Sequence, residues 1–332
     1  MGHLQDGIWH EDFFDIDARG RFQRQATRFH NWITADGSPG PSGDGGFPAE
    51  SGRYHLYVSL ACPWAHRTLI FRKLKKLDDH ISVSVVDPLM GAGGWAFTDA
   101  YPDKAENFSF LTDVYLRANP TYTGRVTVPV LWDKQKKTIV SNESSEIIRM
   151  FNSAFDAFTS VRTDYYPQPL RGAIDEINAL VYDNINNGVY RTGFATSQEA
   201  YEEGFRALFA ALDKVEGILS RQRYLTGPTI TEADWRLFTT LIRFDAVYFG
   251  HFKCNLRRID DYPNLSNYLR ELYQVPGVAE TVSVDHFKRH YYGSHPKVNP
   301  TGIVPLGPEL HFDAAHDRAR FDQARPAARA VT

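Results

Sequence analysis

The chain has two cysteines, and Cys62 is the one placed where a thiol could act as a nucleophile. It follows a strand-like segment and precedes Pro63, a residue that suits the first turn of a helix. Backbone N–H groups and the positive end of the helix dipole stabilise a thiolate at such a position. We therefore expect the pKa of Cys62 to lie below that of a free thiol. Arg67, one turn later, would either add positive charge there or be solvated.

The second cysteine of a Cys-x-x-Cys redox pair would fall at Ala65 and is missing. A dithiol–disulfide cycle within the site is therefore excluded, and any resolving thiol must come from another molecule. Cys254 is distant in the sequence, and we interpret it as structural. Two cysteines are also too few for a disulfide-stabilised fold or a structural zinc site.

Two further positions carry groups that could hold a peptide-like ligand. If the bond between Val128 and Pro129 is cis, it presents the Val128 backbone N–H and C=O beside the Cys62 sulfur, where an extended peptide can add as a strand. Glu143 and Ser144 stand before a helical segment, and a helix N-terminus binds carboxylates. Simple capping of that helix is compatible with the same residues.

Two other kinds of site are disfavoured. His286 and His290 have the spacing of a metal-binding pair, but no Glu follows the first His and no third ligand is suitably spaced. Cys62 with a distant His could indicate a papain-like hydrolase. The local signature around such a cysteine is absent, however, and the strand–helix–strand setting argues against it. We expect no metal site.

The elements that position these residues can be read from hydrophobic patterning. Residues 54–59 and 81–86 have strand patterns and flank a helical pattern over 64–76, which predicts a β-α-β unit with parallel strands. Strands over 127–132 and 138–141 and a helix from Ser145 to Phe155 are predicted next. The segments after about residue 165 have helical spacing, and these are residues 167–187, 197–221, 232–249 and 263–274. Thr231 and Asp234 form a predicted capping box at the start of the third segment.

This order predicts an α/β domain over residues 51–158, followed by an all-α domain over 165–332 that ends in a C-terminal extension. Residues 1–50 are predicted to form an irregular arm, because they show little periodicity and include a Gly- and Pro-rich loop at 36–46. The segment 90–119 is predicted to be a long loop. The stretch 310–332 is either a short surface helix or a tail.

Composition limits the possible functions. The 332 residues are 42% hydrophobic and 23% charged, with a net charge of −3, so the chain lacks the basic footprint of a nucleic-acid binder. It contains neither an apolar run of about 18 residues nor the features of a signal peptide. We expect a cytoplasmic protein without nucleic-acid or membrane partners. Aromatic residues make up 14%, enough to line a pocket as well as a core.

The element order around Cys62 resembles the thioredoxin-like half of glutathione transferases. Gly-Pro-Thr-Ile-Thr-Glu-Ala-Asp at 227–234 resembles the capping motif of their helical half. More specific motifs resemble the glutathionyl-hydroquinone reductases, or Xi-class glutathione transferases. These are Cys-Pro-Trp-Ala-His-Arg at 62–67, Gly-Gly-Trp at 93–95, Asn-Asn-Gly-Val-Tyr at 186–190, His-Tyr-Tyr-Gly-Ser-His at 290–295 and Asn-Pro-Thr-Gly-Ile-Val-Pro at 299–305.

The resemblance implies a thioredoxin-like N-terminal domain, an all-α C-terminal domain and a homodimer. It implies glutathione as co-substrate, with neither metal nor nicotinamide. In such a site Ser144 takes the γ-glutamyl carboxylate of glutathione and Glu143 takes its amino group. The remaining residues implied are Trp95, Arg125 and Val128 for glutathione, Pro129 as a cis-proline, and Tyr190 and Tyr291 for the hydroquinone.

The function implied is the reduction of S-glutathionyl-hydroquinones, which are small aromatic glutathione conjugates. The Cys62 thiolate would attack the sulfur of the conjugate and form a mixed disulfide with glutathione, which a second glutathione resolves to glutathione disulfide. One alternative is a general thioltransferase or dehydroascorbate reductase that uses the same cysteine. Another is a non-catalytic scaffold built on a glutathione transferase body.

Overall fold

A four-stranded mixed sheet forms the frame of the N-terminal half. The computed structural model describes residues 2–11, 16–41 and 46–322. Strand β5 (Tyr54–Val58) is parallel to β6 (Ile81–Val85) and antiparallel to β8 (Val130–Asp133), which pairs with β9 (Thr138–Ser141). All five residues of β5 are buried, as expected for the aromatic and β-branched residues of a central strand. The predicted β-α-β unit is confirmed.

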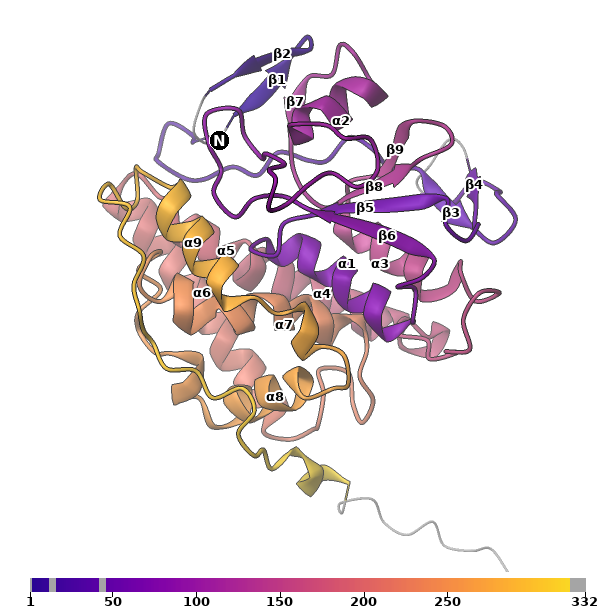
Figure 1. Cartoon of the computed structure of the whole chain (residues 1–332). Coiled ribbons are helices and arrows are strands. Elements are labelled where there is room, and N and C mark those ends of the chain that lie inside the picture. The colour runs from indigo at the N-terminus through magenta and orange to yellow at the C-terminus, as the bar shows by residue number, and fades with distance from the viewer. Residues whose placement is uncertain (1, 12–15, 42–45, 323–332) are drawn as a thin grey trace, which may run out of the picture.

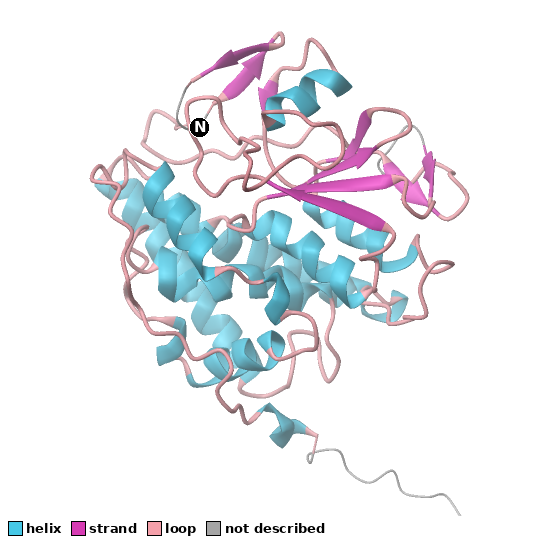
Figure 2. Ribbon diagram, in the orientation of Figure 1, coloured by secondary structure: helices cyan, strands magenta, loops and turns pink. Residues whose placement is uncertain are grey.

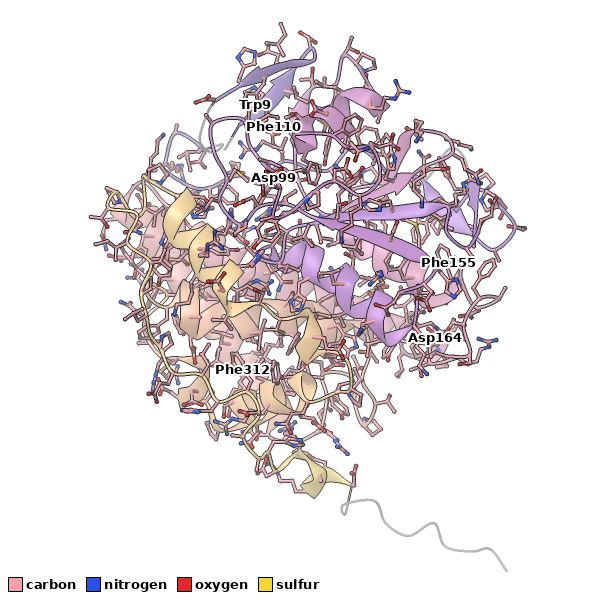
Figure 3. All side chains as sticks on the ribbon, viewed as in Figure 1. Trp9, Asp99, Phe110, Phe155, Asp164 and Phe312 are labelled. Carbon is pink, nitrogen blue, oxygen red and sulfur yellow. The ribbon has the colours of Figure 1, made fainter. Side chains whose placement is uncertain are left out.

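Helices α1 (Pro63–Leu74) and α3 (Ser144–Ser153) lie side by side on one face of this sheet (Figure 1). Pro63 occupies the first turn of α1, so its missing N–H leaves no bond unmade. Phe155, just beyond α3, packs edge-on against Tyr54 of β5 with ring centroids 6.0 Å apart (Figure 3). The contact holds the C-terminal end of α3 against the central strand of the sheet.

Part of the segment predicted as a long loop is helical. Helix α2 (Leu111–Ala118) lies within residues 90–119 and packs against β9, so the loop prediction is wrong there. Its start carries a local signal that the prediction missed. The Asp113 carboxylate accepts the backbone N–H of Phe110 at 2.9 Å, a short polar cap that precedes only two turns of helix.

The second half is helical, as predicted, and it lies against the sheet side that carries α1 and α3 (Figure 2). Its helices are α4 (Arg171–Val181), α5 (Gly188–Gly193), α6 (Gln198–Leu219), α7 (Glu232–Arg243), α8 (Pro263–Tyr273) and α9 (Val284–Ser294). Helix α9 lies outside the four predicted segments, because its few apolar positions are separated by His, Lys and Arg side chains.

Two of the helices continue into a π-helical turn at the ends nearest α1. Residues Tyr182–Asn186 extend α4, and residues Phe244–Tyr248 extend α7. A π turn adds a residue to the helical repeat and so re-aims the side chains that follow, which is why such turns recur at functional sites.

Asp234 anchors the start of α7. Its carboxylate accepts the backbone N–H groups of Thr231 at 2.8 Å and Leu225 at 2.9 Å, and the Tyr268 hydroxyl at 2.8 Å. Asp234 is fully buried. The carboxylate therefore joins α7, the preceding loop and α8, and the capping role predicted for Asp234 is confirmed.

The arm predicted as irregular contains short strands. These are β1 (His3–Gln5), β2 (Ile8–His10), β3 (Trp32–Thr34) and β4 (Gly46–Pro48). Strand β1 pairs with β2 and with β7 (Gly124–Arg125), more than a hundred residues away. Trp9 of β2 donates its indole N–H to the carbonyl of Ala92 at 2.9 Å (Figure 3). Strands of three residues are too short to leave a periodic pattern in the sequence.

Some predictions fall partly outside the described residues. In the loop at 36–46, residues 42–45 are not described. In the stretch 310–332, residues Arg318–Phe321 form a 3-10 turn, and residues 323–332 are not described. Within the described part of the chain, every helix is too short or too polar to span a membrane.

Candidate active site

A cavity of about 410 Å³ opens beside the N-terminus of α1. Its walls come from the sheet region, from α5 and α9 of the helical half, and from the N-terminal arm. All nine residues that the sequence singled out lie on this cavity: Cys62, Trp95, Arg125, Val128, Pro129, Glu143, Ser144, Tyr190 and Tyr291. The fold therefore brings together positions that are spread over 230 residues of sequence.

Cys62 is the N-cap residue of α1, and its thiol faces the cavity. The backbone of Cys62 is held by a bond from its N–H to the carbonyl of Ser59 at 3.1 Å. Its sulfur lies 3.5 Å from the Val128 carbonyl, to which the thiol donates. The Val128–Pro129 peptide bond is cis, the conformation expected for it. The sulfur and the Val128 backbone thus stand together, where an extended ligand could lie along Val128.

The pKa of Cys62 departs from the expectation. Burial raises it above the ordinary value of a thiol. The N–H groups of Ala65 and Trp64 and the guanidinium groups of Arg243 and Arg24 lower it, but burial outweighs them. The prediction of a lowered pKa was therefore wrong. It identified the helix N–H groups correctly but left out the burial of the sulfur, which disfavours the thiolate.

Arg67 is not among the groups with the largest effects on the pKa of Cys62, and it is buried and not solvated. Its guanidinium is buried, donates to the Asn186 side-chain oxygen at 2.8 Å and to the Ser144 hydroxyl at 3.3 Å, and stacks on Trp64. Arg67 therefore ties α1 to the start of α3 and to the π turn after α4. The residue one turn beyond the cysteine is structural, and the cations near the sulfur come from elsewhere in the chain.

The start of α3 forms the second wall. Glu143 is its N-cap, and its carboxylate accepts the N–H of Ser145 at 3.0 Å and the Ser145 hydroxyl at 2.9 Å. Ser144, the first residue of the helix, is buried with its hydroxyl toward Arg67. Both residues also line the cavity, so their place at the start of the helix leaves them within reach of a ligand.

Trp95 reaches the cavity from the loop between β6 and α2. Its indole stacks on the imidazole of His290 in α9, with centroids 4.7 Å apart and planes inclined by 24°. His290 in turn donates from Nδ1 to the carbonyl of Pro88 at 3.0 Å. These contacts fix the orientation of the indole, and they join the loop of one half to a helix of the other.

Three tyrosines cluster at the helical end of the cavity. The hydroxyls of Tyr190 and Tyr291 share a hydrogen bond of 2.6 Å, and those of Tyr248 and Tyr291 share one of 3.2 Å. Burial raises the pKa of all three phenols. They are therefore protonated at neutral pH and can donate hydrogen bonds. Tyr248 was missed in the sequence, since no motif separated it from the other 16 tyrosines.

The N-terminal arm supplies the remaining wall, for which the sequence offered no signal. The Arg24 guanidinium lies 4.8 Å from the ring centroids of Trp64 and Tyr190 and donates to the Asn187 side chain at 2.6 Å. Thr27 donates its hydroxyl to Glu143 at 3.3 Å. The arm is thus bonded to the helical half and to the start of α3 on either side of the cavity.

The disfavoured sites are accounted for by local contacts. His286 shares a hydrogen bond of 3.1 Å with the Tyr101 hydroxyl. His290 donates to the Pro88 carbonyl and stacks on the Trp95 indole. Among the described residues, no group of three His, Cys, Asp or Glu side chains is arranged to hold a metal ion. Cys254 is buried, and burial raises its pKa.

The fold and the site define the class of glutathione transferases. The family model "Glutathione S-transferase, N-terminal domain" matches residues 61–154, and the model "Glutathione S-transferase, C-terminal domain" matches residues 198–271. The chain is 58% identical over 323 residues to glutathionyl-hydroquinone reductase YqjG of Escherichia coli, covering 96% of this chain and 98% of that protein. It therefore belongs to the glutathionyl-hydroquinone reductase family, the Xi-class glutathione transferases.

Other relatives agree with this assignment. Glutathionyl-hydroquinone reductase PcpF of Sphingobium chlorophenolicum is 54% identical, with 93% of this chain and 96% of that protein covered. The glutathione-bound structure of YqjG superposes with a TM-score of 0.89 at 56% identity, over 96% of this chain and 99% of that one. A Xi-class glutathione transferase from Natrialba magadii gives a TM-score of 0.89 at 50% identity, with 96% and 97% covered.

Proposed function

We propose that the chain reduces S-glutathionyl-hydroquinones to hydroquinones with glutathione as co-substrate, and that Cys62 is the nucleophile. The observation that carries the proposal is the placing of two protonated tyrosines, Tyr190 and Tyr291, and one thiol on the same cavity, with Tyr248 bonded to Tyr291. A thiol alone would serve any mixed disulfide. Phenols that can donate hydrogen bonds suit a substrate with ring oxygens.

The glutathionyl part of the substrate is proposed to lie along the sheet edge. Val128 pairs with its backbone, and Ser144 with the N-terminal N–H groups of α3 receives the γ-glutamyl carboxylate. Glu143 is proposed to bind the amino group, and Arg125 the glycyl carboxylate. The Trp95 indole, already fixed by His290, would lie against the ligand. This placement leaves the sulfur of the conjugate beside the Cys62 thiol.

In the first step the Cys62 thiolate attacks the sulfur of the conjugate. A sulfur–sulfur bond forms, the aryl carbon–sulfur bond breaks, and its electron pair goes to the ring carbon, which takes up a proton. The ring is thereby reduced and Cys62 is oxidised to a mixed disulfide with glutathione. Tyr190 and Tyr291 are proposed to hold the ring oxygens and to assist the protonation of the carbon.

In the second step a free glutathione thiolate attacks the mixed disulfide at the glutathionyl sulfur. Glutathione disulfide leaves and the Cys62 thiolate is regenerated. The cycle consumes one free glutathione for each ring reduced, the conjugate supplies the second glutathionyl group of the disulfide, and neither a metal nor a nicotinamide is needed. The raised pKa of Cys62 fits an attacking thiol that becomes strongly nucleophilic once ionised.

Product stoichiometry tests this proposal. Purified protein is incubated with a synthetic S-glutathionyl-hydroquinone and glutathione, and hydroquinone and glutathione disulfide are quantified by chromatography. Equal amounts of the two products are expected, with activity lost in Cys62→Ala and kept in the matched control Cys254→Ala. Hydroquinone release by Cys62→Ala at the wild-type rate would refute the role of Cys62.

The alternatives predict other outcomes of the same experiment. A general thioltransferase would turn over mixed disulfides at least as well as the hydroquinone conjugate, and a dehydroascorbate reductase would do so with dehydroascorbate. A scaffold would leave Cys62 unmodified after incubation with glutathione disulfide, which mass spectrometry detects. The chain is further proposed to act as a cytoplasmic homodimer, and sedimentation equilibrium at micromolar concentration would report a monomer if this is wrong.

A further inference from the structure

Arg243 is a buried cation on the wall behind Cys62. It is the last residue of α7, directly before the π turn, and its side chain is 0% exposed. Its Nε donates to the carbonyl of Ala61 at 2.8 Å and its Nη2 to the carbonyl of Leu60 at 2.9 Å. Its Nη1 donates to the carbonyl of Thr239 at 2.7 Å. The guanidinium therefore joins the end of α7 to the two residues that precede Cys62.

The fourth partner of Arg243 is a neutral imidazole. Nη1 lies 3.0 Å from Nδ1 of His66. Thr281 donates its only hydroxyl proton to the carbonyl of Val278 at 2.6 Å, so its oxygen must accept the bond of 2.7 Å from Nε2 of His66. Nε2 therefore carries the proton, and Nδ1 accepts from Arg243. Burial and the charge of Arg243 both lower the pKa of His66, in keeping with this tautomer.

Each hydrogen-bond acceptor of Arg243 in the described chain is thus neutral. A buried charge with no opposite charge is costly, and carbonyl dipoles with the C-terminal end of α7 offset it only in part. The Phe287 ring, with its centroid 3.9 Å from the guanidinium carbon, adds a weaker attraction. A nearby anion would stabilise the charged guanidinium at this position.

The acidic groups around Arg243 are those of the site. Tyr248, Tyr291, Cys62 and Tyr190 all act to keep the guanidinium charged against the effect of burial. Cys62 ionises most readily of these four, since a thiol has an ordinary pKa of about 8.5 and a phenol of about 10. The anion that completes the charge balance of this wall is therefore the Cys62 thiolate.

We propose that Arg243 is the positioning residue of the Cys62 nucleophile. Its hydrogen bonds to the carbonyls of Leu60 and Ala61 fix the turn that carries the cysteine, and its positive charge is the buried counterion of the thiolate. This deepens the proposed function, because it assumes that Cys62 reacts as a thiolate. The other groups that act on the sulfur are Arg24 from the arm and the N–H groups of Trp64 and Ala65 from α1. Arg24 lines the cavity, and the two N–H groups belong to the first turn of α1. Arg243, by contrast, is buried and does not line the cavity.

The test measures the ionisation of Cys62 directly. The rate of iodoacetamide alkylation of Cys62 is followed from pH 5 to 10 by peptide mass spectrometry, in wild type and in Arg243→Met, Arg243→Gln and Arg243→Lys. Met and Gln remove the charge, and the midpoint is expected to move up by about one pH unit or more. Lys keeps the charge but lacks the planar guanidinium whose Nε and Nη2 reach the carbonyls of Ala61 and Leu60. Its midpoint should stay close to wild type, while its turnover falls about tenfold or more because the turn is less well held.

Arg318 provides the matched control. It is also 0% exposed, and it donates to the carbonyls of Leu219, Gln222 and Arg223, far from the cavity. Arg318→Met should lower the melting temperature to a similar extent as Arg243→Met and leave the alkylation midpoint unchanged. If Arg243 were merely structural, Arg243→Met would lower the melting temperature and leave the alkylation midpoint unchanged, as expected for Arg318→Met.

The outcomes separate the inference from the proposed function. A folded Arg243→Met or Arg243→Gln whose midpoint equals that of wild type overturns the inference, even if the hydroquinone reaction is confirmed. If neither neutral variant folds, Arg243→Lys decides. A midpoint shifted by a full unit, or a turnover equal to that of wild type, contradicts the inference. Because alkylation needs no hydroquinone, a failure of the proposed reaction leaves this readout intact.

Discussion

At the scale of single residues, the site joins a thiol to hydrogen-bond donors of two kinds. Backbone N–H groups and guanidinium groups favour a negative charge on Cys62, and phenols face the place where the ring of a conjugate would lie. Burial holds the phenols in their protonated form and at the same time raises the pKa of the thiol. The balance between burial and positive charge therefore sets the reactivity of the sulfur.

Replacing Tyr190 or Tyr291 by Phe should separate hydroquinone reduction from general thiol exchange. Each change keeps the ring and removes the hydroxyl. Loss of a hydrogen bond to a developing phenolate should lower kcat/KM for an S-glutathionyl-hydroquinone by a factor corresponding to roughly 1.5–3 kcal/mol. The same variants should reduce the mixed disulfide of glutathione and hydroxyethanethiol at nearly the wild-type rate, because that leaving group has no ring oxygen.

Steady-state kinetics on both substrates measures this difference. Tyr262→Phe is a suitable control, because its hydroxyl bonds Asp213 away from the cavity. Equal losses on the two substrates would show that the tyrosines support Cys62 or the fold, and the hydroquinone pocket would have to be sought elsewhere.

Arg24 should tune the ionisation of Cys62 from the arm. Its positive charge lowers the pKa of the thiol, so Arg24→Ala should move the alkylation midpoint upward and slow alkylation at neutral pH. Arg21→Ala is the matched control, since Arg21 pairs with Glu203 on the outer side of the arm. If both variants alkylate with the wild-type pH profile, Arg24 holds the arm and does not act on the sulfur.

The residues found from the sequence are those that belong to short motifs. Cys62, Val128 and Ser144 each lie at a junction between predicted elements, and the resemblance to Xi-class glutathione transferases implied the roles of Ser144, Tyr190 and Tyr291. Arg24, Tyr248 and Arg243 were missed because only tertiary packing brings them to the sulfur. Arg67 was misjudged for the same reason, because its partners lie in α3 and in the π turn after α4.

At the scale of elements, two helix starts and the π turn after α4 contribute to the cavity, and the π turn after α7 carries Tyr248, which bonds Tyr291. The N-termini of α1 and α3 present the thiol and the carboxylate-binding end, while the π turns after α4 and α7 lie beside the tyrosines. The start of α7 is held by Asp234, so its correct placement also sets the position of Arg243 at the other end of the same helix.

Asp234→Ala should destabilise the fold without touching the cavity. It would leave two backbone N–H groups and the Tyr268 hydroxyl without their buried acceptor, at a cost of about 2–4 kcal/mol. Urea denaturation followed by circular dichroism measures the free energy of unfolding. Asp260→Ala removes an exposed carboxylate paired with Arg270 and should change that free energy by less than about 1 kcal/mol. Equal effects of the two changes would contradict the anchoring role.

The sequence predicted long and regularly patterned elements better than short ones. The β-α-β unit and the helices α6, α7 and α8 were correct, because a buried face imposes its period over several turns. Helix α2 and the strands β1 to β4 were missed, since two helical turns or three strand residues are too short to show a period. Helix α9 was missed because His, Lys and Arg interrupt its apolar face, and two of its polar residues line the cavity.

At the scale of the whole molecule, the cavity depends on three parts of the chain. The sheet region carries the sulfur, the helical half carries the tyrosines, and the arm is bonded to both through Arg24 and Thr27. A ligand that fills the cavity would contact all three parts. Binding should therefore hold the arm more firmly against the body of the protein.

Hydrogen exchange can test this coupling. Amides of residues 22–27 are expected to exchange more slowly when glutathione is added at saturating concentration, and more slowly still with a bound conjugate. Residues 302–307, which include the exposed Ile303 and Leu306, should exchange at the same rate with and without ligand. Unchanged exchange rates across residues 22–27 would show that ligand binding does not stabilise the arm.

The central claim is that Cys62 takes the glutathionyl group from the hydroquinone. A single-turnover experiment without free glutathione tests it most directly, with enzyme in excess over an S-glutathionyl-hydroquinone and rapid quenching. The account predicts one hydroquinone released for each Cys62 that gains a glutathionyl group, with equal rates for the two events by mass spectrometry. Hydroquinone released while Cys62 stays unmodified would contradict the account.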